Sequence, residues 1–185
     1  MDLHTLSRLP LSAEHGWPEL ARIRPGLLRV FATLVLPLSL VPPVMLYFAG
    51  TYHPEMFGRE LAAKPWGEVS VVFFVAEIAT LLAMGWFIRQ VAATHGLAID
   101  RHDAYLLAAI APVPMWLSAL GLLVPSLLVA AIVAIAGLGL SCGIVYHGIQ
   151  ALGRSREEVS AAGVVQTVIG AGLVAWAFLL LIALT

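Results

Sequence analysis

One ionisable side chain lies in the middle of a long apolar stretch of this sequence. Glu77 is the only charged residue between Glu68 and Arg89. If the stretch crosses a membrane as a helix, a charge at its centre costs several kcal/mol unless the group is neutral or partnered. Thr80 lies on the same helical face. Two hypotheses stay open: a neutral Glu77 that is hydrogen-bonded inside a bundle, or a Glu77 that handles protons, ions or substrates.

Two prolines interrupt a later apolar stretch. Pro112 and Pro114 have no N–H group, so they release backbone carbonyls near Ala108 and Ile110. A carbonyl without a partner is not tolerated in lipid, and a protonated Glu77 at a similar depth can donate to one of them. The prolines either kink a packed helix or mark a substrate site. Broken helices mark binding sites in transporters, but no matching interruption in a second half indicates an inverted repeat.

Small residues recur at helical spacing in the last two apolar stretches. Such residues let helix backbones approach closely in lipid. The predicted helix-packing residues are Gly137, Gly139, Ser141, Gly143, Gly163 and Gly170. They serve either packing within one chain or a homodimer face. Gln166, on a neighbouring stripe, is expected to cross-link helices. The candidate polar site within the membrane comprises Glu77, Thr80, Pro112, Pro114, Ser118 and Gln166.

The other reactive side chains form no recognisable site. His95, Asp100, His102 and Asp103 cluster in one polar link, but their spacing matches no zinc motif. The lone Cys142 rules out an intrachain disulfide and a cysteine-built metal site. The sequence has no nucleophile elbow, phosphate-binding loop or nucleotide-binding glycine motif. We therefore expect no catalytic residue, no metal, no cofactor and no enzymatic activity.

The composition of the 185-residue chain indicates the environment of these side chains. Hydrophobic residues make up 61% of the sequence and charged residues 11%, whereas soluble domains are about half apolar and about a quarter charged. The net charge of -1 provides no basic surface for nucleic acid. The sequence therefore predicts an integral membrane protein whose partner is the lipid bilayer, and it excludes nucleic acid as a partner.

Five apolar stretches are long enough to cross a bilayer as helices, which takes about 20 residues each. They run over residues 27–50, 68–90, 104–122, 126–148 and 160–185. Before them, residues 17–23 place a proline at a favourable first helical position and apolar residues at helical spacing, which predicts a short helix on the membrane surface. We expect an all-α fold, with an N-terminal segment over residues 1–26 and a five-helix transmembrane domain over residues 27–185.

The distribution of basic residues predicts the orientation of these spans. One side carries Arg8, Arg22, Arg24, Arg29, Arg89, Arg101, Arg154 and Arg156, and the other side carries Arg59 and Lys64. Because cytoplasmic segments are rich in Lys and Arg, the N-terminus is expected in the cytoplasm and the C-terminus on the periplasmic or extracellular side. The interfacial tryptophans and tyrosines fit the same arrangement. The expected location is the inner (plasma) membrane.

The later spans are similar to a known family. Residues 104–128 and 143–163 resemble the bacterial branch of the Yip (Ypt/Rab-interacting protein) family. The positions that match its third-helix pattern and the end of its fourth helix are Tyr105, Pro112, Trp116, Leu117, Ser118, Pro125, Val145, Tyr146 and Gly148. Ala111 stands where that family usually has Thr, and His147 interrupts an apolar pair. The resemblance implies a five-helix membrane protein with a cytoplasmic N-terminus, whose eukaryotic relatives act in vesicle trafficking and bind small GTPases.

Two functions stay open at this point. The first is a non-enzymatic interaction or membrane-organising module of the Yip family, with a membrane or cytoplasmic protein partner or a homo-oligomer. The sequence favours it by being rich in packing faces and poor in reactive groups. The second is a small proton-linked carrier or channel that uses Glu77 beside the proline-broken third helix. A polar path from water to Glu77 would favour transport, and a sealed bundle would favour the module.

Overall fold

The computed structural model describes residues 16–58, 63–153 and 158–184. Every regular element in these ranges is helical, and five stretches are long and apolar enough to span a membrane. These findings confirm the predicted all-α, multi-pass fold. Residues 1–15 of the predicted N-terminal segment lie outside the described residues, as do Arg59, Arg154 and Arg156 of the orientation argument.

Prolines divide the first span, Leu27–Tyr52. Its elements are α3 (Leu27–Val30), the π-helical turn η1 (Phe31–Val35), α4 (Leu36–Ser39) and α5 (Val41–Tyr52). A proline in a helix clashes with the carbonyl four residues earlier and donates no hydrogen bond to it. For Pro37 that carbonyl belongs to Thr33, inside η1. The wider π-helical turn therefore lies where the regular hydrogen-bond ladder cannot continue.

The later spans begin and end close to the predicted residues. The elements are α6 (Trp66–Thr94), α7 (Arg101–Ile110), α8 (Val113–Ser118), the 3-10 helix η3 (Ala119–Leu123), α9 (Leu127–Leu152) and α10 (Glu158–Leu184). The short elements α2 (Trp17–Ile23) and η2 (Pro54–Phe57) precede the first and second spans. The largest differences from prediction are at the ends of α6 and α9, which each continue four residues further, to Thr94 and Leu152.

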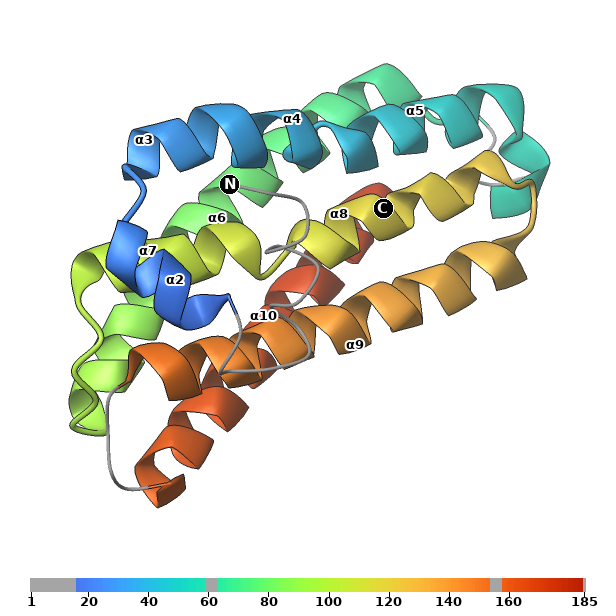
Figure 1. Ribbon diagram of the computed structural model, residues 1–185. Helices are drawn as coiled ribbons and strands as arrows, with labels where there is room; N and C mark the ends of the chain where they lie inside the picture. The colour runs from blue at the N-terminus through green and yellow to red at the C-terminus, as the bar shows by residue number, and fades with distance from the viewer. Residues whose placement is uncertain (1–15, 59–62, 154–157, 185) are drawn as a thin grey trace.

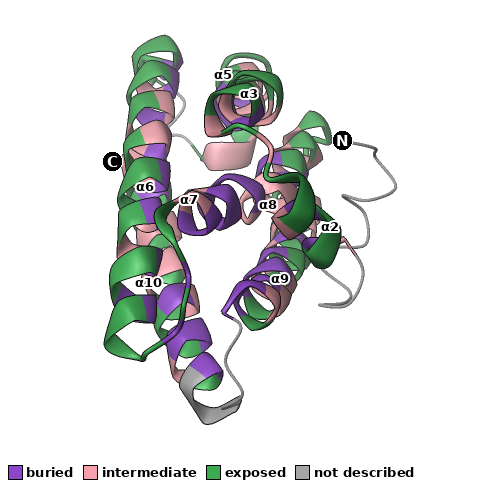
Figure 2. Cartoon of the chain, turned by 60° about the vertical axis from the view of Figure 1, so that its left-hand side comes forward, coloured by how far each residue is buried: buried purple, intermediate pink, exposed green. Residues whose placement is uncertain are grey.

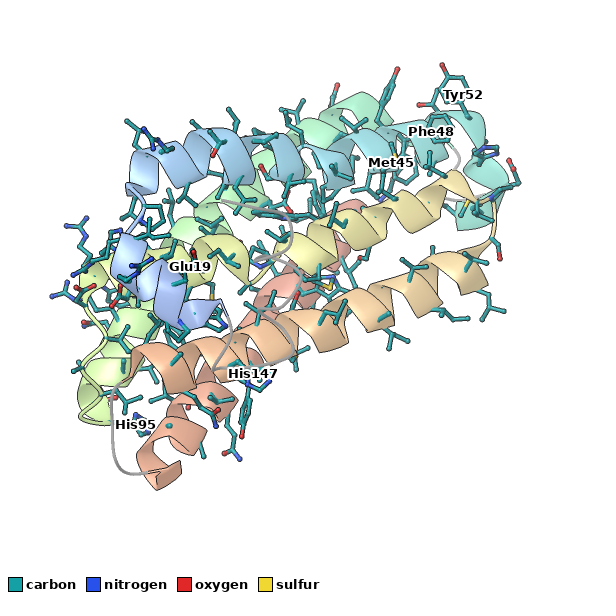
Figure 3. All side chains as sticks on the ribbon, viewed as in Figure 1. Glu19, Met45, Phe48, Tyr52, His95 and His147 are labelled. Atoms are coloured by element: carbon teal, nitrogen blue, oxygen red, sulfur yellow. The ribbon has the colours of Figure 1, made fainter. Side chains whose placement is uncertain are left out.

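The helix α7 lies at the centre of the bundle, with α6, α9 and the first span around it (Figure 2). It is buried from Leu106 to Ile110. The two ends of the bundle are distinct in Figure 1, where α2 lies beside the start of α7 and the end of α9. Figure 3 places Phe48 and Tyr52 at the opposite end from His95. We refer to these ends as the Tyr52 end and the α2 end.

The short helix α2 packs on the bundle through its aromatic and aliphatic side chains. Trp17 is fully buried and Leu20 is 2% exposed, whereas Ile23 is 59% exposed. A Cβ atom added at Gly148, on α9, would lie 2.8 Å from the Trp17 ring and 2.6 Å from Leu107. The glycine at position 148 therefore lets the tryptophan reach the bundle. The helix predicted for the membrane surface is present, and its apolar face is bound to the protein.

Candidate functional site

Glu77 on α6 is paired with a tryptophan on α8. The Glu77 residue is 7% exposed, and Trp116 is 2% exposed. Trp116 is the hydrogen-bonding neighbour of the Glu77 carboxyl group, and its indole N–H is the group that can donate. The sequence allowed a protonated Glu77 to donate to a carbonyl released by the prolines, but no such bond is made among the described residues, and Trp116 was not foreseen as its neighbour. The signal was present in the sequence, because a buried tryptophan usually finds an acceptor for its N–H.

The break in the third span positions Trp116. Helix α7 ends at Ile110, and α8 begins at Val113 directly after Pro112. Because prolines cannot continue the ladder of backbone hydrogen bonds, the chain turns and starts a new helix. The backbone N–H of Trp116 bonds to the Pro112 carbonyl at 2.9 Å, within the first turn of that new helix. The predicted break therefore determines where the Trp116 side chain leaves the backbone.

A cavity of about 610 Å³ lies among α6, α8, α9 and α10. Both Glu77 and Trp116 line it. Along α6 the lining residues extend from Trp66 to Ile88, which is about 33 Å of helix at 1.5 Å per residue. The cavity is therefore about as long as the hydrocarbon core of a bilayer is thick, roughly 30 Å.

Small side chains on α9 and α10 leave this space open. The small lining residues of these two helices are Ala130, Ala131, Ala134, Gly172, Ala175 and Ala183. Toward the α2 end the same helices bury large side chains, and Ile149 and Val164 there are completely inaccessible. Cores are normally packed without large voids. Larger side chains such as Ile135, Leu173 and Trp176 line the same space, so the small residues account for only part of the open volume.

Three buried polar atoms of lining residues have no hydrogen-bond partner in the part of the chain that the structure describes. They are Oε2 of Glu77, Oγ of Ser141 and Nε1 of Trp66. A buried polar atom without a partner costs about 1 to 3 kcal/mol, so most such atoms are bonded. Residues of the cavity wall thus contain unused hydrogen-bonding capacity.

Two further predicted residues line the cavity with their hydroxyl groups already bonded. Thr80 Oγ1 donates to the Ala76 carbonyl at 2.7 Å, and Ser118 Oγ donates to the Met115 carbonyl at 2.7 Å. Both acceptors belong to the same helix as the donor, which is the usual way to satisfy Ser and Thr in an apolar environment. These hydroxyls add little polarity to the cavity.

The remaining predicted polar residues lie in different places. Pro112 lines the cavity, whereas Pro114 does not. A Cβ atom at Gly137 would lie 2.9 Å from the Pro114 carbonyl and 2.8 Å from Ser118 Cβ, so Gly137 packs α9 closely against α8. Gln166 is exposed on α10 and lies outside the lining. The cross-link for which Gln166 was a candidate is therefore not made among the described residues.

The other predicted packing residues have varied surroundings. An added Cβ at Gly163 would lie 3.1 Å from His95 Nε2, so this glycine packs against the α6 end. Gly139 and Gly170 are exposed, and no other described part of the chain approaches within 4 Å of a Cβ added at either. Gly143 is half-buried. A homodimer face that includes Gly139 stays a prediction.

A second group of titratable side chains lies at the α2 end. Asp100, His102 and Asp103 bring their possible ligand atoms within 4.8 Å of one another. Asp100 caps α7 by accepting from the Asp103 backbone N–H at 2.8 Å, and it also pairs with Arg24. These bonds, chiefly the one from Asp103, hold the pKa of Asp100 below its ordinary value. Because His102 Nε2 donates to the Pro25 carbonyl at 3.0 Å, the group connects the chain after α2 to α7.

Comparison with known proteins relates nearly the whole chain to one family. Residues 9–179 match the Yip1 domain. The matched range includes the α2 helix, the first four spans and most of α10. No curated protein and no solved structure matches the chain.

Proposed function

The chain belongs to the Yip1 domain family, and from that premise we propose a non-enzymatic module that binds another membrane component and organises the membrane around it. A multi-pass membrane protein meets such components within the bilayer. The proposed binding site is the cavity among α6, α8, α9 and α10.

The chemistry of the cavity wall supports this proposal. The lining consists mainly of aliphatic and aromatic side chains, and Glu77 is the only carboxyl group among the described lining residues. The volume of the cavity falls within the range of about 300 to 1,000 Å³ that is typical of ligand sites. A catalytic site needs a nucleophile and a base in mutual reach, whereas the neighbour of Glu77 is the indole of Trp116. An apolar wall favours the binding of an apolar partner.

The proposed orientation follows from the basic residues. Because Lys and Arg favour the cytoplasmic side, we place the N-terminus in the cytoplasm and the protein in the inner membrane. The α2 end is then cytoplasmic, and the Tyr52 end faces the periplasm or the exterior. In this orientation a lipid or a membrane protein reaches the cavity from within the bilayer.

Two glycines on α10 provide a matched test. Gly172 lines the cavity and Gly170 does not, while a Cβ at either glycine meets no other described part of the chain within 4 Å. We expect Gly172→Leu to fill the cavity and Gly170→Leu to leave it open. Each variant is purified from native membranes, and the copurified lipids and proteins are identified by mass spectrometry. A component held by the wild type and Gly170→Leu but lost from Gly172→Leu supports the module. The same composition in all three would refute it.

A second candidate function is a small proton-linked carrier. One observation favours it: Glu77 Oε2 has no partner among the described residues and belongs to a cavity beside the proline-broken third span. If this candidate is right, vesicles containing the protein should show a solute flux that depends on the pH gradient, and Glu77→Gln should abolish that flux without unfolding the protein. If the binding module is right, the flux across such vesicles should equal that of empty vesicles.

A further inference from the structure

The cavity is long and narrow. Its lining follows one face of α6 over about 33 Å, from Trp66 to Ile88, and its volume is about 610 Å³. A transmembrane helix of a second copy is about 10 Å wide and about 30 Å long, which is too large for this space. The shape therefore fits a narrow, elongated molecule better than a helix.

The unpaired oxygens of Glu77 and Ser141 can be satisfied by a polar group of such a molecule at some depth. Trp116 on α8 bonds Glu77, and on the same helix Ser118 packs against Gly137, one turn before Ser141. The unpaired oxygens of Glu77 and Ser141 therefore lie at a similar level of the bundle. A carboxyl group that stays neutral in the apolar interior keeps an O–H, and so does the serine, so both can donate to an accepting oxygen.

The depth of Glu77 separates two kinds of lipid. Glu77 is eleven residues from the start of α6 at Trp66, which is about 16 Å of helix and about half of the hydrocarbon thickness. The ester groups of a bilayer phospholipid stay near the interface, so they do not reach this carboxyl group. A single-chain lipid can enter the cavity completely and bring its terminal oxygen to Glu77.

We propose that the cavity binds a single-chain lipid with a hydrogen-bond-accepting oxygen at its polar end, such as a long-chain fatty acid. The oxygen accepts from Glu77, and the hydrocarbon chain lies against the apolar lining of α9 and α10. This inference rests on the proposed binding function and names the class of ligand for the same cavity.

Tryptophan fluorescence can test this proposal, because Trp66, Trp116 and Trp176 line the cavity. The probe is dibromostearic acid, whose bromine atoms quench tryptophan on contact, added to the protein in phosphatidylcholine nanodiscs. Wild type and Gly170→Leu should show the same saturable quenching. Gly172→Leu should bind the probe at least about tenfold more weakly, which is a change of about 1.4 kcal/mol. Circular dichroism and a single elution peak establish that each variant is folded.

Substitutions at Glu77 test the polar contact separately. Glu77→Leu removes the donor and should weaken binding about tenfold, as expected for a lost buried hydrogen bond. Glu77→Gln keeps two N–H donors of similar size and should bind the probe like the wild type. If Glu77→Leu fails to fold, two other results together support the polar contact at Glu77. Glu77→Gln and wild type bind the acid with equal affinity, and the matching dibrominated hydrocarbon shows no saturable binding. Saturable binding of that hydrocarbon with the affinity of the acid would overturn it.

Three outcomes overturn the lipid proposal in distinguishable ways. Quenching that is equal and unsaturable in all variants means that the probe only partitions into the bilayer. Quenching by dibrominated phosphatidylcholine that is lost in Gly172→Leu means that a phospholipid tail occupies the cavity. If a copurified protein is lost from Gly172→Leu while the acid never binds, the proposed function survives and the lipid proposal fails. If neither the copurified set nor the quenching depends on Gly172, both proposals fail.

Discussion

The hydrogen bond between Trp116 and Glu77 should be measurable in the free energy of unfolding. Each single substitution leaves a buried polar group without its partner, which costs about 1 to 3 kcal/mol. Trp116→Phe removes the donor and keeps most of the ring, and Glu77→Leu removes the acceptor at similar size. Both residues are more than nine-tenths buried, so the partner that remains is largely shielded from solvent. We expect each single variant to be destabilised by an amount in this range.

The double variant distinguishes the hydrogen bond from general packing. Replacing both partners with apolar groups of similar shape can be nearly neutral, so the double variant should be less destabilised than the sum of the two single variants. Hydrogen bonds between membrane helices have measured coupling energies averaging about 0.6 kcal/mol, with a maximum of about 1.7 kcal/mol. We expect the coupling between Trp116 and Glu77 to lie within this range.

The assay is unfolding in mixed micelles with an increasing fraction of dodecyl sulfate, followed by circular dichroism. Glu77→Gln serves as the control, because its amide oxygen still accepts from the indole, and it should unfold with nearly the wild-type free energy. Additive losses in the two single variants would refute the reasoning, since they would show that the bond seen between α6 and α8 contributes nothing to stability.

Three further predictions concern the two ends of the bundle. Gly148→Ala should destabilise the docked α2 helix by about 1 to 3 kcal/mol, since the new Cβ would lie 2.6 Å from a neighbouring side chain. Limited proteolysis measures how well α2 stays docked, with Gly139→Ala as the open-site control. Equal protection of the two variants would contradict the prediction. Asp100→Ala should cost about 0.5 to 2 kcal/mol at pH 7 through loss of the α7 cap. Hydrogen bonding lowers the pKa of Asp100 in the folded protein. The stability that the cap contributes is therefore complete above the ordinary pKa of about 3.9 and is lost as the pH falls through the lowered folded value. The thermal unfolding temperatures of wild type and Asp100→Ala should then converge in acid, and a constant difference at all pH values would argue against the cap. In a chain without Cys142, an impermeant maleimide should label a cysteine placed at Thr51 in intact cells and spare one placed at Ala98, and the opposite pattern would reverse the proposed orientation.

Much of the fold could be predicted because a bilayer imposes its own length on the sequence. A helix needs about 20 apolar residues to cross the hydrocarbon, whatever it packs against. The five spans therefore appear directly in the pattern of charges and apolar runs. The break at Pro112 is equally local, because a missing N–H and a ring clash act within one turn of helix. The depth of Glu77 follows from counting residues along its span.

The directions in which the helices face could not be predicted in the same way. In a soluble protein the apolar face of a helix marks the core, but in a membrane the faces toward lipid and toward other helices are both apolar. The sequence therefore offered no reason to place Gly137 against α8 and Gly139 on the outside, only two residues away. For the same reason Gln166 was expected between helices and lies on an exposed face.

The candidate site depends on these facing directions more than on any single residue. Glu77 stands out in the sequence by its charge, which is costly in lipid wherever the helix is rotated. Only the tertiary structure decided that Trp116 on α8 becomes the neighbour of this carboxyl group on α6. The cavity likewise depends on how α6, α8, α9 and α10 are placed around it. Such a space is set by the distance between helices, and a sequence pattern along one helix carries no information about that distance.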